Sequence, residues 1–343
     1  MKNKILSLTL GLVAGVVSAQ DIHFSQFYMA PIQLNPGAAG TEADIRVHLN
    51  YKEQWKSVAS PYKTIGGSYD MRFKKTKSGY FGGGIFFYSD RAGDARMGVA
   101  QGNLNLAYHL VIGQGQTLGL GVMGGYAQRS VNTTNMQWGN QYDGMAYNSS
   151  LPAGEIGAGN FSNSYLDLGT GLVYTYTQGE KNLTGNNQIS ATAGIAMFHV
   201  HKPDYSFLGD GSENLYRKFV IHGNSLFGIA HSRISVIPGF QYKIQGGARE
   251  LVFGSSVRYR IMEDSHFTGF VTGSSLSLGF YYRNRDAVIL TSLLQFGGYG
   301  IGISYDLNVS DLTQASNGRG GLEIALRYIY PSGNKNLKSS RFL

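Results

Sequence analysis

Strict alternation of apolar and polar residues constrains the fold of this chain more than any other feature. Between residues 44 and 55, and again between 62 and 73, nearly every second residue is apolar or aromatic, and polar or charged residues stand between them. A period of two places alternate side chains on opposite faces of a β-strand, whereas a helix requires a period near 3.6. One face of each strand thus carries the charged residues, and the other carries a long series of apolar and aromatic residues. Such strands are typical of a wall between lipid and an aqueous interior.

The same pattern recurs along the chain and predicts an all-β fold, a transmembrane antiparallel β-barrel of about fourteen strands. The predicted strands are 44–55, 62–73, 79–90, 98–110, 117–129, 164–177, 187–200, 216–229, 232–245, 248–260, 270–283, 286–296, 299–309 and 320–330. With an even strand count, the long connections 130–163 and 201–215 fall on one side and are expected to face outward. Short turns such as Lys74–Ser78 fall on the opposite, periplasmic side.

The first nineteen residues have the pattern of a secretory signal peptide. Lys2 and Lys4 precede an apolar run from Ile5 to Val17, and small residues follow it. After residue 19 the sequence contains no uninterrupted run of about 18 apolar residues, so no membrane-spanning helix is expected. The chain contains no cysteine, so neither disulfides nor lipid attachment at a cysteine is expected. We therefore expect export to the outer membrane of a Gram-negative cell.

A short segment, 20–43, separates the signal peptide (1–19) from the barrel (44–330), and a polar tail (331–343) follows the barrel. Phe24, Phe27, Tyr28 and Pro31 have the spacing of one or two helical turns, and a turn signal begins at Asn35. We expect this segment to cover or plug the barrel with its rings against the rim. The alternative is a docking site for a partner.

The formal net charge of +8 comes from scattered basic residues. A nucleic-acid-binding protein would concentrate them on one face beside stacking aromatic residues, so no nucleic-acid partner is expected. Outer-membrane lipid and acidic periplasmic partners fit an exported protein better. Glycines within the strands, such as Gly82, Gly119 and Gly121, would permit bends and the close packing of a plug.

Two sets of residues are candidates for function. The first lies on the polar face of the strands and is expected to form a paired network in the lumen that holds the N-terminal segment; the alternative is an ion-selective conduit. Its members are Arg46, Asp70, Arg72, Asp306, Glu323 and Arg327. The second set is expected to dock a partner and consists of His23, Phe24, Ser25, Gln26, Phe27, Tyr28, Asn35, Pro36, Lys74, Lys75 and Lys77.

Motifs for catalysis or metal binding have no supporting context. The stretch from Gly119 to Gly124 fits GxGxxG, but no helix follows it. His199 and His201 share a strand face without a third ligand at a defined spacing, and a rim pair is the better interpretation. Acidic residues between 204 and 213 lack the EF-hand spacing. The sequence therefore predicts no enzyme, no catalytic or cofactor-binding residues and no metal site.

Short motifs along the chain resemble those of the PorP/SprF family of the Bacteroidota. They are His23-Phe24-Ser25-Gln26-Phe27-Tyr28, Leu34-Asn35-Pro36, Ala39-Gly40-Thr41, Asn50-Tyr51, Gln54-Trp55, Pro61-Tyr62-Lys63-Thr64, Ser68-Tyr69-Asp70, Tyr282-Arg283, Ser304-Tyr305-Asp306 and Gly320-Gly321. Gly37-Ala38 departs from the family pattern, and the middle of the chain, 130–270, diverges.

The resemblance implies a non-enzymatic outer-membrane barrel of type IX protein secretion or gliding motility. Members of the family depend on periplasmic or outer-membrane subunits of this machinery, and some serve individual secreted adhesins. We expect an anchoring or docking role for such a partner. The alternative function is a porin-like channel for small solutes.

Overall fold

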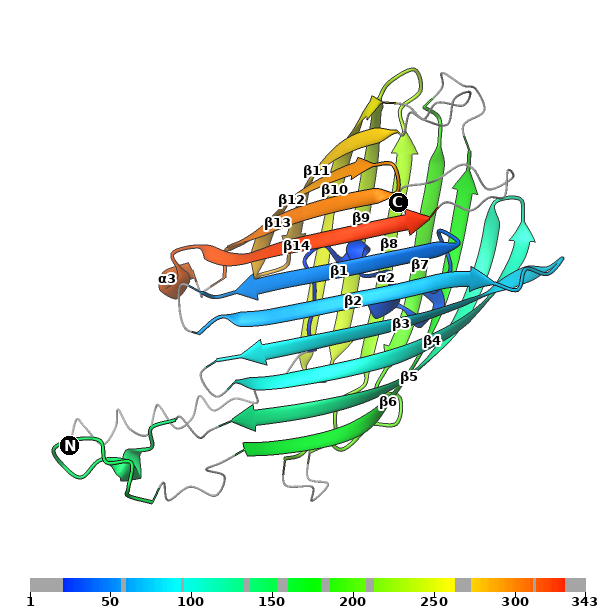
Figure 1. The fold of residues 1–343 in the computed structure, drawn as a ribbon. Helices are drawn as coiled ribbons and strands as arrows, with labels where there is room; N and C mark the ends of the chain where they lie inside the picture. Colours follow the sequence, from blue (N-terminus) through cyan, green and yellow to red (C-terminus); the bar gives the residue numbers. More distant parts are fainter. Residues whose placement is uncertain are drawn as a thin grey trace.

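The computed structural model describes residues 21–56, 60–93, 96–132, 136–152, 160–179, 186–207, 213–262, 273–310 and 313–330. Within them, fourteen antiparallel strands close into one barrel in chain order, with β1 beside β14 (Figure 1). They are β1 (Ile45–Gln54), β2 (Tyr62–Phe73), β3 (Gly79–Ala92), β4 (Met97–Gly113), β5 (Gln116–Asn132), β6 (Asn160–Gln178), β7 (Ile189–Phe198), β8 (Lys218–Gly228), β9 (Ile234–Gln245), β10 (Ala248–Met262), β11 (Ser274–Arg283), β12 (Ala287–Phe296), β13 (Tyr299–Asn308) and β14 (Arg319–Tyr330).

The predicted barrel and its strand count are confirmed, and all fourteen strands lie where the alternation placed them. The largest differences concern strand ends. β5 and β6 extend beyond the predicted 117–129 and 164–177, because their paired register continues without a break from Gln116↔Tyr176 to Asn132↔Asn160. β11 begins at Ser274 instead of 270. The expected signal peptide, the expected tail from 331 and parts of the connections 130–163 and 201–215 lie outside the described residues.

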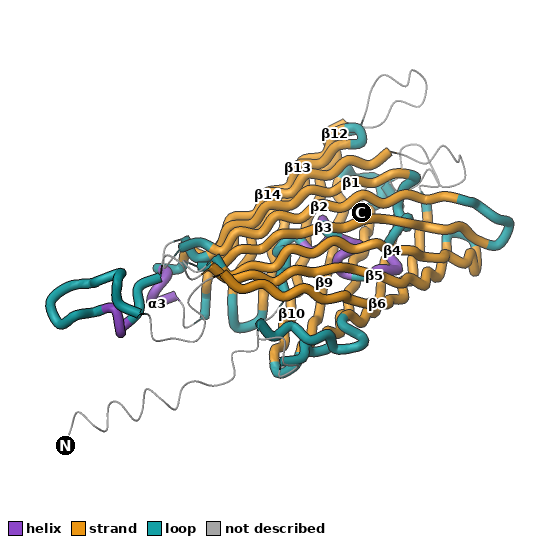
Figure 2. The backbone as a smooth tube through the Cα atoms, turned by 60° about the horizontal axis from the view of Figure 1, so that its bottom comes forward, coloured by secondary structure: helices purple, strands orange, loops and turns teal. Residues whose placement is uncertain are grey.

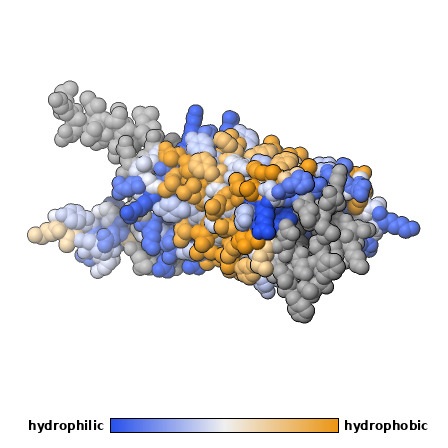
Figure 3. Space-filling view, turned by 90° about the horizontal axis from the view of Figure 1, so that it is seen from above, coloured by the Kyte–Doolittle hydropathy of each residue, from blue (hydrophilic) through white to orange (hydrophobic). Residues whose placement is uncertain are grey.

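The wall exposes its apolar side chains and buries its charges. On the outer face Leu104 is 69% exposed and Leu166 66%, whereas Arg46 and Lys52 on the inner face are each 1% exposed. Figure 3 shows an apolar band across the visible wall with hydrophilic residues toward both ends. No helix among the described residues is long and apolar enough to cross a bilayer. Closure pairs the backbone N–H and C=O groups of each strand with those of its two neighbours, and the apolar outer faces suit the hydrocarbon of a bilayer. The chain is therefore a membrane β-barrel.

Antiparallel order gives the barrel two mouths with different connections. The loop mouth carries the β1–β2, β3–β4, β5–β6, β7–β8, β9–β10, β11–β12 and β13–β14 connections, and the short α3 (Thr313–Ser316) lies there. The turn mouth carries the β2–β3, β4–β5 and β12–β13 turns, the start of β1 and the end of β14. The β5–β6 connection contains the 3₁₀ turn η3 (Gly139–Gln141).

Residues 21–43, here called the lumen segment, lie inside the barrel. They form three short turns, η1 (Phe27–Met29), α2 (Pro31–Leu34) and η2 (Pro36–Ala38), which Figure 2 shows enclosed by the strands. The predicted one or two helical turns are thus present, in interrupted form. The interruption follows from Pro31 and Pro36, which begin α2 and η2, and from Asn35, whose side chain accepts a hydrogen bond from the backbone N–H of Gly37.

Candidate functional site

The lumen segment enters at the loop mouth and leaves at the turn mouth. At its first residue, the carboxylate of Asp21 lies 2.8 Å from Nε2 of His199 and 2.5 Å from Nζ of Lys218. Gln245 adds hydrogen bonds to the backbone N–H and the carboxylate of Asp21. His199 follows β7, Lys218 begins β8 and Gln245 ends β9, so all three lie at the loop mouth. The chain therefore crosses the lumen before it turns back as β1.

The charges around Asp21 hold one another in their ionised forms. Burial alone would lower the pKa of His199, but the carboxylates of Asp21 and Asp167, which contact its two ring nitrogens, raise that pKa to about 9. Burial alone would raise the pKa of Asp21, but Lys218 and His199 hold it well below its usual range. A buried imidazolium between two carboxylates favours one position of the segment's first residue.

One turn further in, backbone donors of the segment meet a buried carboxylate of the wall. The N–H groups of Ser25 and Gln26 donate to the two oxygens of Glu323, over 2.6 and 3.0 Å. The hydroxyl of Ser25 donates to Asp306, which also accepts from Arg283. A carboxylate that accepts two backbone N–H groups satisfies donors that water cannot reach.

His23 lies between these two sets of contacts. Its Nδ1 is 3.3 Å from Glu250, and its carbonyl oxygen accepts a hydrogen bond from Lys52. Glu250 and Lys52 thus hold His23 from two strands of the wall, β10 and β1.

The far end of the segment is held by arginines of β1 and β2. Arg46 forms an ion pair with Asp70 over 2.9 Å and a second one with Glu42, and it also donates to the carbonyl oxygen of Ala38. Asp70 in turn accepts from the backbone N–H of Gly40. Arg72 donates to the carbonyl oxygens of residues 40 and 41. Side-chain charges of the wall thus replace the backbone partners that this irregular stretch lacks.

Glycines of the wall let the backbone of the segment approach it directly. A Cβ at Gly121 would lie 2.5 Å from the carbonyl carbon of Pro36 and 2.6 Å from Cα of Gly37. Gly82 likewise faces the backbone of Ala39, whereas Gly171 and Gly194 face the side-chain amide of Asn35. The amide of Asn35 also donates to the carbonyl oxygens of Leu172 and Ile195. The wall from β3 to β7 is therefore shaped around this segment.

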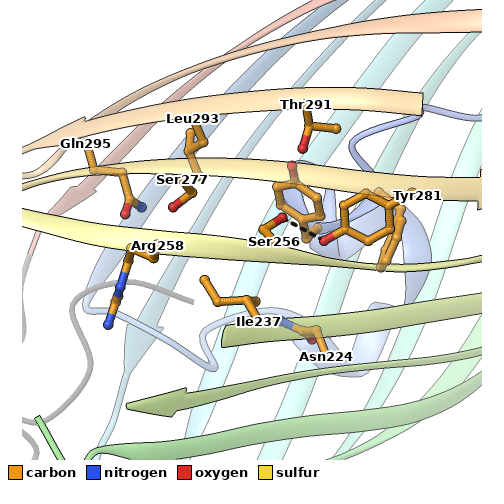
Figure 4. Close-up of a pocket in the computed structure, with 11 residues that line it drawn as sticks. Asn224, Ile237, Ser256, Arg258, Ser277, Tyr281, Thr291, Leu293 and Gln295 are labelled. Atoms are coloured by element: carbon orange, nitrogen blue, oxygen red, sulfur yellow. Dashed lines mark hydrogen bonds between the residues drawn. The ribbon is translucent and has the colours of Figure 1, made fainter. Parts of the chain in front are cut away.

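A small cavity remains between the segment and strands β8 to β12. It measures about 30 Å³, enough for about two water molecules, and Figure 4 shows its lining. The rings of Phe27, Tyr28 and Tyr281 pack edge-on or tilted on one side, with centroids 5.6 to 6.0 Å apart. Tyr281 shares a hydrogen bond of 3.1 Å with Ser256. The rings of the segment thus pack against the inner wall, and the expected packing against the rim is wrong, because the segment runs through the lumen.

The six residues of the predicted lumen network all lie buried on the inner face, but not in one cluster. Arg46, Asp70 and Arg72 hold the turn-mouth end of the segment, and Asp306 and Glu323 hold its loop-mouth end. Arg327 is paired in register with His48 of β1, between the two groups.

The eleven residues of the predicted docking set are divided between the lumen and one mouth. His23 to Tyr28, Asn35 and Pro36 are buried or half-buried inside the barrel. Lys74, Lys75 and Lys77 are exposed in the β2–β3 turn at the turn mouth, opposite to the mouth that holds Asp21. The structure therefore does not bring these two parts of the set together.

Sequence reasoning missed several residues that hold the segment: Asp21, Asp167, Lys218, Gln245, Glu250 and Arg283. Most stand on the polar face of their strands, which a period of two can detect, but nothing local tells which residues meet across the lumen. His199, interpreted as half of a rim pair, is buried between carboxylates, whereas His201 is exposed.

A closed wall with an apolar exterior, buried charges inside and a chain segment through its lumen defines a plugged membrane β-barrel. A family described as "Type IX secretion system membrane protein PorP/SprF" matches residues 16–328. The chain belongs to this family, as its motifs had indicated. It is thus a membrane component of type IX secretion, a role that implies contact with other components of the machinery. The family is not a known enzyme family.

Several solved outer-membrane proteins are similar to this chain at low sequence identity. The translocator domain of the autotransporter NalP from Neisseria meningitidis is 10% identical, with 88% of this chain and 93% of that chain covered and a TM-score of 0.40. BamA from Haemophilus ducreyi, in a form lacking POTRA domains 1–3, is 9% identical, with 84% of this chain and 71% of that chain covered and a TM-score of 0.42. A deletion mutant of the TodX monoaromatic hydrocarbon channel is 11% identical, with 87% of this chain and 93% of that chain covered and a TM-score of 0.47. No relative among curated proteins matches the sequence. The family assignment therefore depends on the family match alone.

Proposed function

We propose that this chain is a non-enzymatic outer-membrane anchor of type IX secretion or gliding, on which periplasmic subunits or a secreted adhesin dock. The observation that carries the proposal is the lumen segment, which wall charges and wall glycines hold at both ends. A barrel built around its own plug supports a scaffold better than a solute channel. The proposed signal peptide directs export of the chain. In the outer membrane the loop mouth then faces the outside of the cell and the turn mouth faces the periplasm.

The basic turn Lys74–Lys77 is the docking site that this orientation offers to periplasmic subunits. The side chains of Lys74, Lys75 and Lys77 are exposed, and Lys75 lies 3.3 Å from Asp44, where the lumen segment joins β1. A partner with acidic residues would gain charge-assisted contacts at this turn. Residues 23–28 would dock a partner only if the segment left the lumen, which would leave Glu323 and Asp70 without their backbone donors.

Conductance separates the anchor from the small-solute channel. The purified full chain in a planar lipid bilayer is expected to stay silent, because the lumen segment is held in place. Stable ohmic openings of the wild-type protein would refute the plugged anchor and favour the channel. The recording is made after folding has been verified by the altered mobility of the unheated protein in gel electrophoresis.

Co-purification tests the basic turn. The variant Lys74→Gln/Lys75→Gln/Lys77→Gln is expected to lose type IX components that co-purify with the wild type from native membranes. The matched control removes three positive charges at the loop mouth, in Lys56→Gln/Lys63→Gln/Lys202→Gln, and should keep them. Equal recovery from both variants would refute docking at this turn.

A further inference from the structure

The β5–β6 connection carries an ordered tip, residues 136–152, that stands beyond the ends of the strands (Figure 1). Its hydrogen bonds are internal. The side chain of Gln141 accepts from the N–H of Trp138 and donates to the carbonyl oxygen of Leu151, and Tyr142 bridges Tyr147 as an antiparallel pair. At the apex, the carboxylate of Asp143 accepts the N–H groups of residues 145 and 146. The tip thus holds its shape through its own contacts.

A long, braced hairpin presents this tip. β5 and β6 pair over seventeen consecutive positions, whereas β7 pairs with β6 only as far as Gly169. Where β7 is missing, Arg129 of β5 stacks between the rings of Tyr205 and Phe207, 4.6 and 4.3 Å from their centroids, and donates to the carbonyl oxygen of Tyr205. The hairpin is therefore paired as far as Asn132 and Asn160, and Arg129 joins its outer part to residues of the β7–β8 connection.

The surface of the tip is almost uncharged, and three large side chains with apolar groups are exposed at its apex. Met145 is 93% exposed, Tyr142 60% and Tyr147 43%. Asp143 is the only charged residue of 136–152, and one of its carboxylate oxygens accepts the two N–H groups of the turn. Tyrosine, tryptophan and methionine are enriched at the centres of protein interfaces, from which charged residues are depleted. With no positive charge to attract anions and a position beyond the strand ends, the tip matches a protein partner better than a lipid headgroup or a nucleic acid.

We propose that residues 136–152 form a docking tip for a protein with an uncharged, apolar pocket, into which Met145 inserts between Tyr142 and Tyr147. The inference rests on the proposed docking function and names the surface that serves it at the loop mouth. A preorganised tip with rigid aromatic side chains loses little conformational entropy on binding. Because the tip carries a single charge, complex formation should depend only weakly on ionic strength.

Site-specific photocrosslinking in native cells tests this surface. A diazirine amino acid replaces Met145 in the full chain, and the matched control places it at His201, an exposed residue of the β7–β8 connection at the same mouth. We expect an adduct at 145, but not at 201, that mass spectrometry identifies as another exported protein. Tyr142→Ser/Tyr147→Ser should reduce the adduct at least about tenfold, because both aromatic anchors are lost. Raising the salt concentration during irradiation of isolated membranes should leave the yield nearly unchanged.

Other outcomes overturn the inference. An adduct with a second copy of this chain, with a glycolipid, or in equal yield at 145 and 201 would exclude a dedicated protein-docking tip. If 145 gives no adduct while wild-type protein still co-purifies with secretion components, the tip inference fails and the anchor function stands. If the wild type co-purifies with no component, the proposed function itself fails. Folding of each variant is checked by heat-modifiable mobility.

Discussion

The carboxylate of Asp21 and the imidazole of His199 lie 2.8 Å apart, although 178 residues separate them in the chain. This contact fixes where the lumen segment begins, at the loop mouth, while Gly40 and Glu42 fix where it ends, at Asp70 and Arg46 of the turn mouth. Both ends of the segment are thus ionic, and its middle is held by close backbone contact with wall glycines. The segment is part of the barrel's core.

The Asp21 contact predicts a defined pH dependence. Because the folded pKa of His199 is raised to about 9, its stabilising contribution is complete below its ordinary pKa near 6.5 and is lost as the pH rises through about 9. The pKa of Asp21 is lowered, so its contribution is present above about pH 4 and is lost only in stronger acid. Hydrogen exchange at residues 21–26 should therefore accelerate between about pH 7 and 10, after correction for intrinsic exchange.

His199→Gln tests the same contact. Removing one partner of a buried ion pair costs on the order of 3 kcal/mol, which corresponds to roughly a hundredfold faster local exchange at residues 21–26 at neutral pH. The acceleration above pH 7 should disappear in this variant. Residues 36–41, held at the opposite mouth, are the internal control. If exchange at residues 36–41 accelerates as strongly as at residues 21–26, the variant unfolds globally, and the local role of the Asp21–His199 contact is wrong.

Two glycines of β5 form a matched pair of tests. Gly121→Ala should destabilise the folded barrel by about 1–3 kcal/mol, because the added Cβ would overlap the backbone at Pro36 and Gly37. Gly124→Ala, three residues along the same strand, should be close to neutral, since nothing lies within 4 Å of its Cβ position. Midpoints of urea unfolding in detergent, followed by gel mobility, measure both. Equal urea midpoints for the two variants would show that the backbone of the lumen segment does not contact β5 closely at Gly121.

Loss of the carboxylate at position 323 should loosen the segment at the loop mouth. Glu323→Ala leaves the N–H groups of Ser25 and Gln26 buried without an acceptor, at a cost of about 2–3 kcal/mol. Glu53→Ala is the control, because the pairs that Glu53 forms with Lys56 and Lys63 are long and partly exposed and contribute less than about 1 kcal/mol. The thermal unfolding midpoint of each protein gives the comparison. A Glu323 variant as stable as the Glu53 variant contradicts this role.

Single-cysteine variants test the orientation, since the chain has no cysteine of its own. Met145→Cys should react with a membrane-impermeant maleimide in intact cells, because the loop mouth is expected to face outside. Lys75→Cys, exposed at the turn mouth, should react only after the outer membrane is permeabilised. The reverse pattern would invert the proposed orientation and move the basic turn to the cell surface.

Part of this structure can be read from local pattern. The alternation of strands such as 62–73 and 320–330 determined element type, position and count, because the side-chain period of a strand is set by its backbone and needs no distant partner. The family resemblance rests on short motifs and was equally accessible. The burial of Arg46, Asp70 and Glu323 followed from the same alternation, because a closed barrel turns one face of every strand inward.

What remained hidden was which inward residues meet. Lys52 faces Glu323 because β1 closes against β14, and Asp21 meets His199 because the lumen segment starts at the loop mouth. Neither pairing leaves a periodic trace in the sequence, since each depends on barrel closure and on the path of one irregular segment. The alternation by itself therefore determined that this chain forms a membrane wall with a charged interior. Only the tertiary structure decided that its own residues 21–43 occupy that interior, because a buried charge takes whatever partner the closed fold brings within reach.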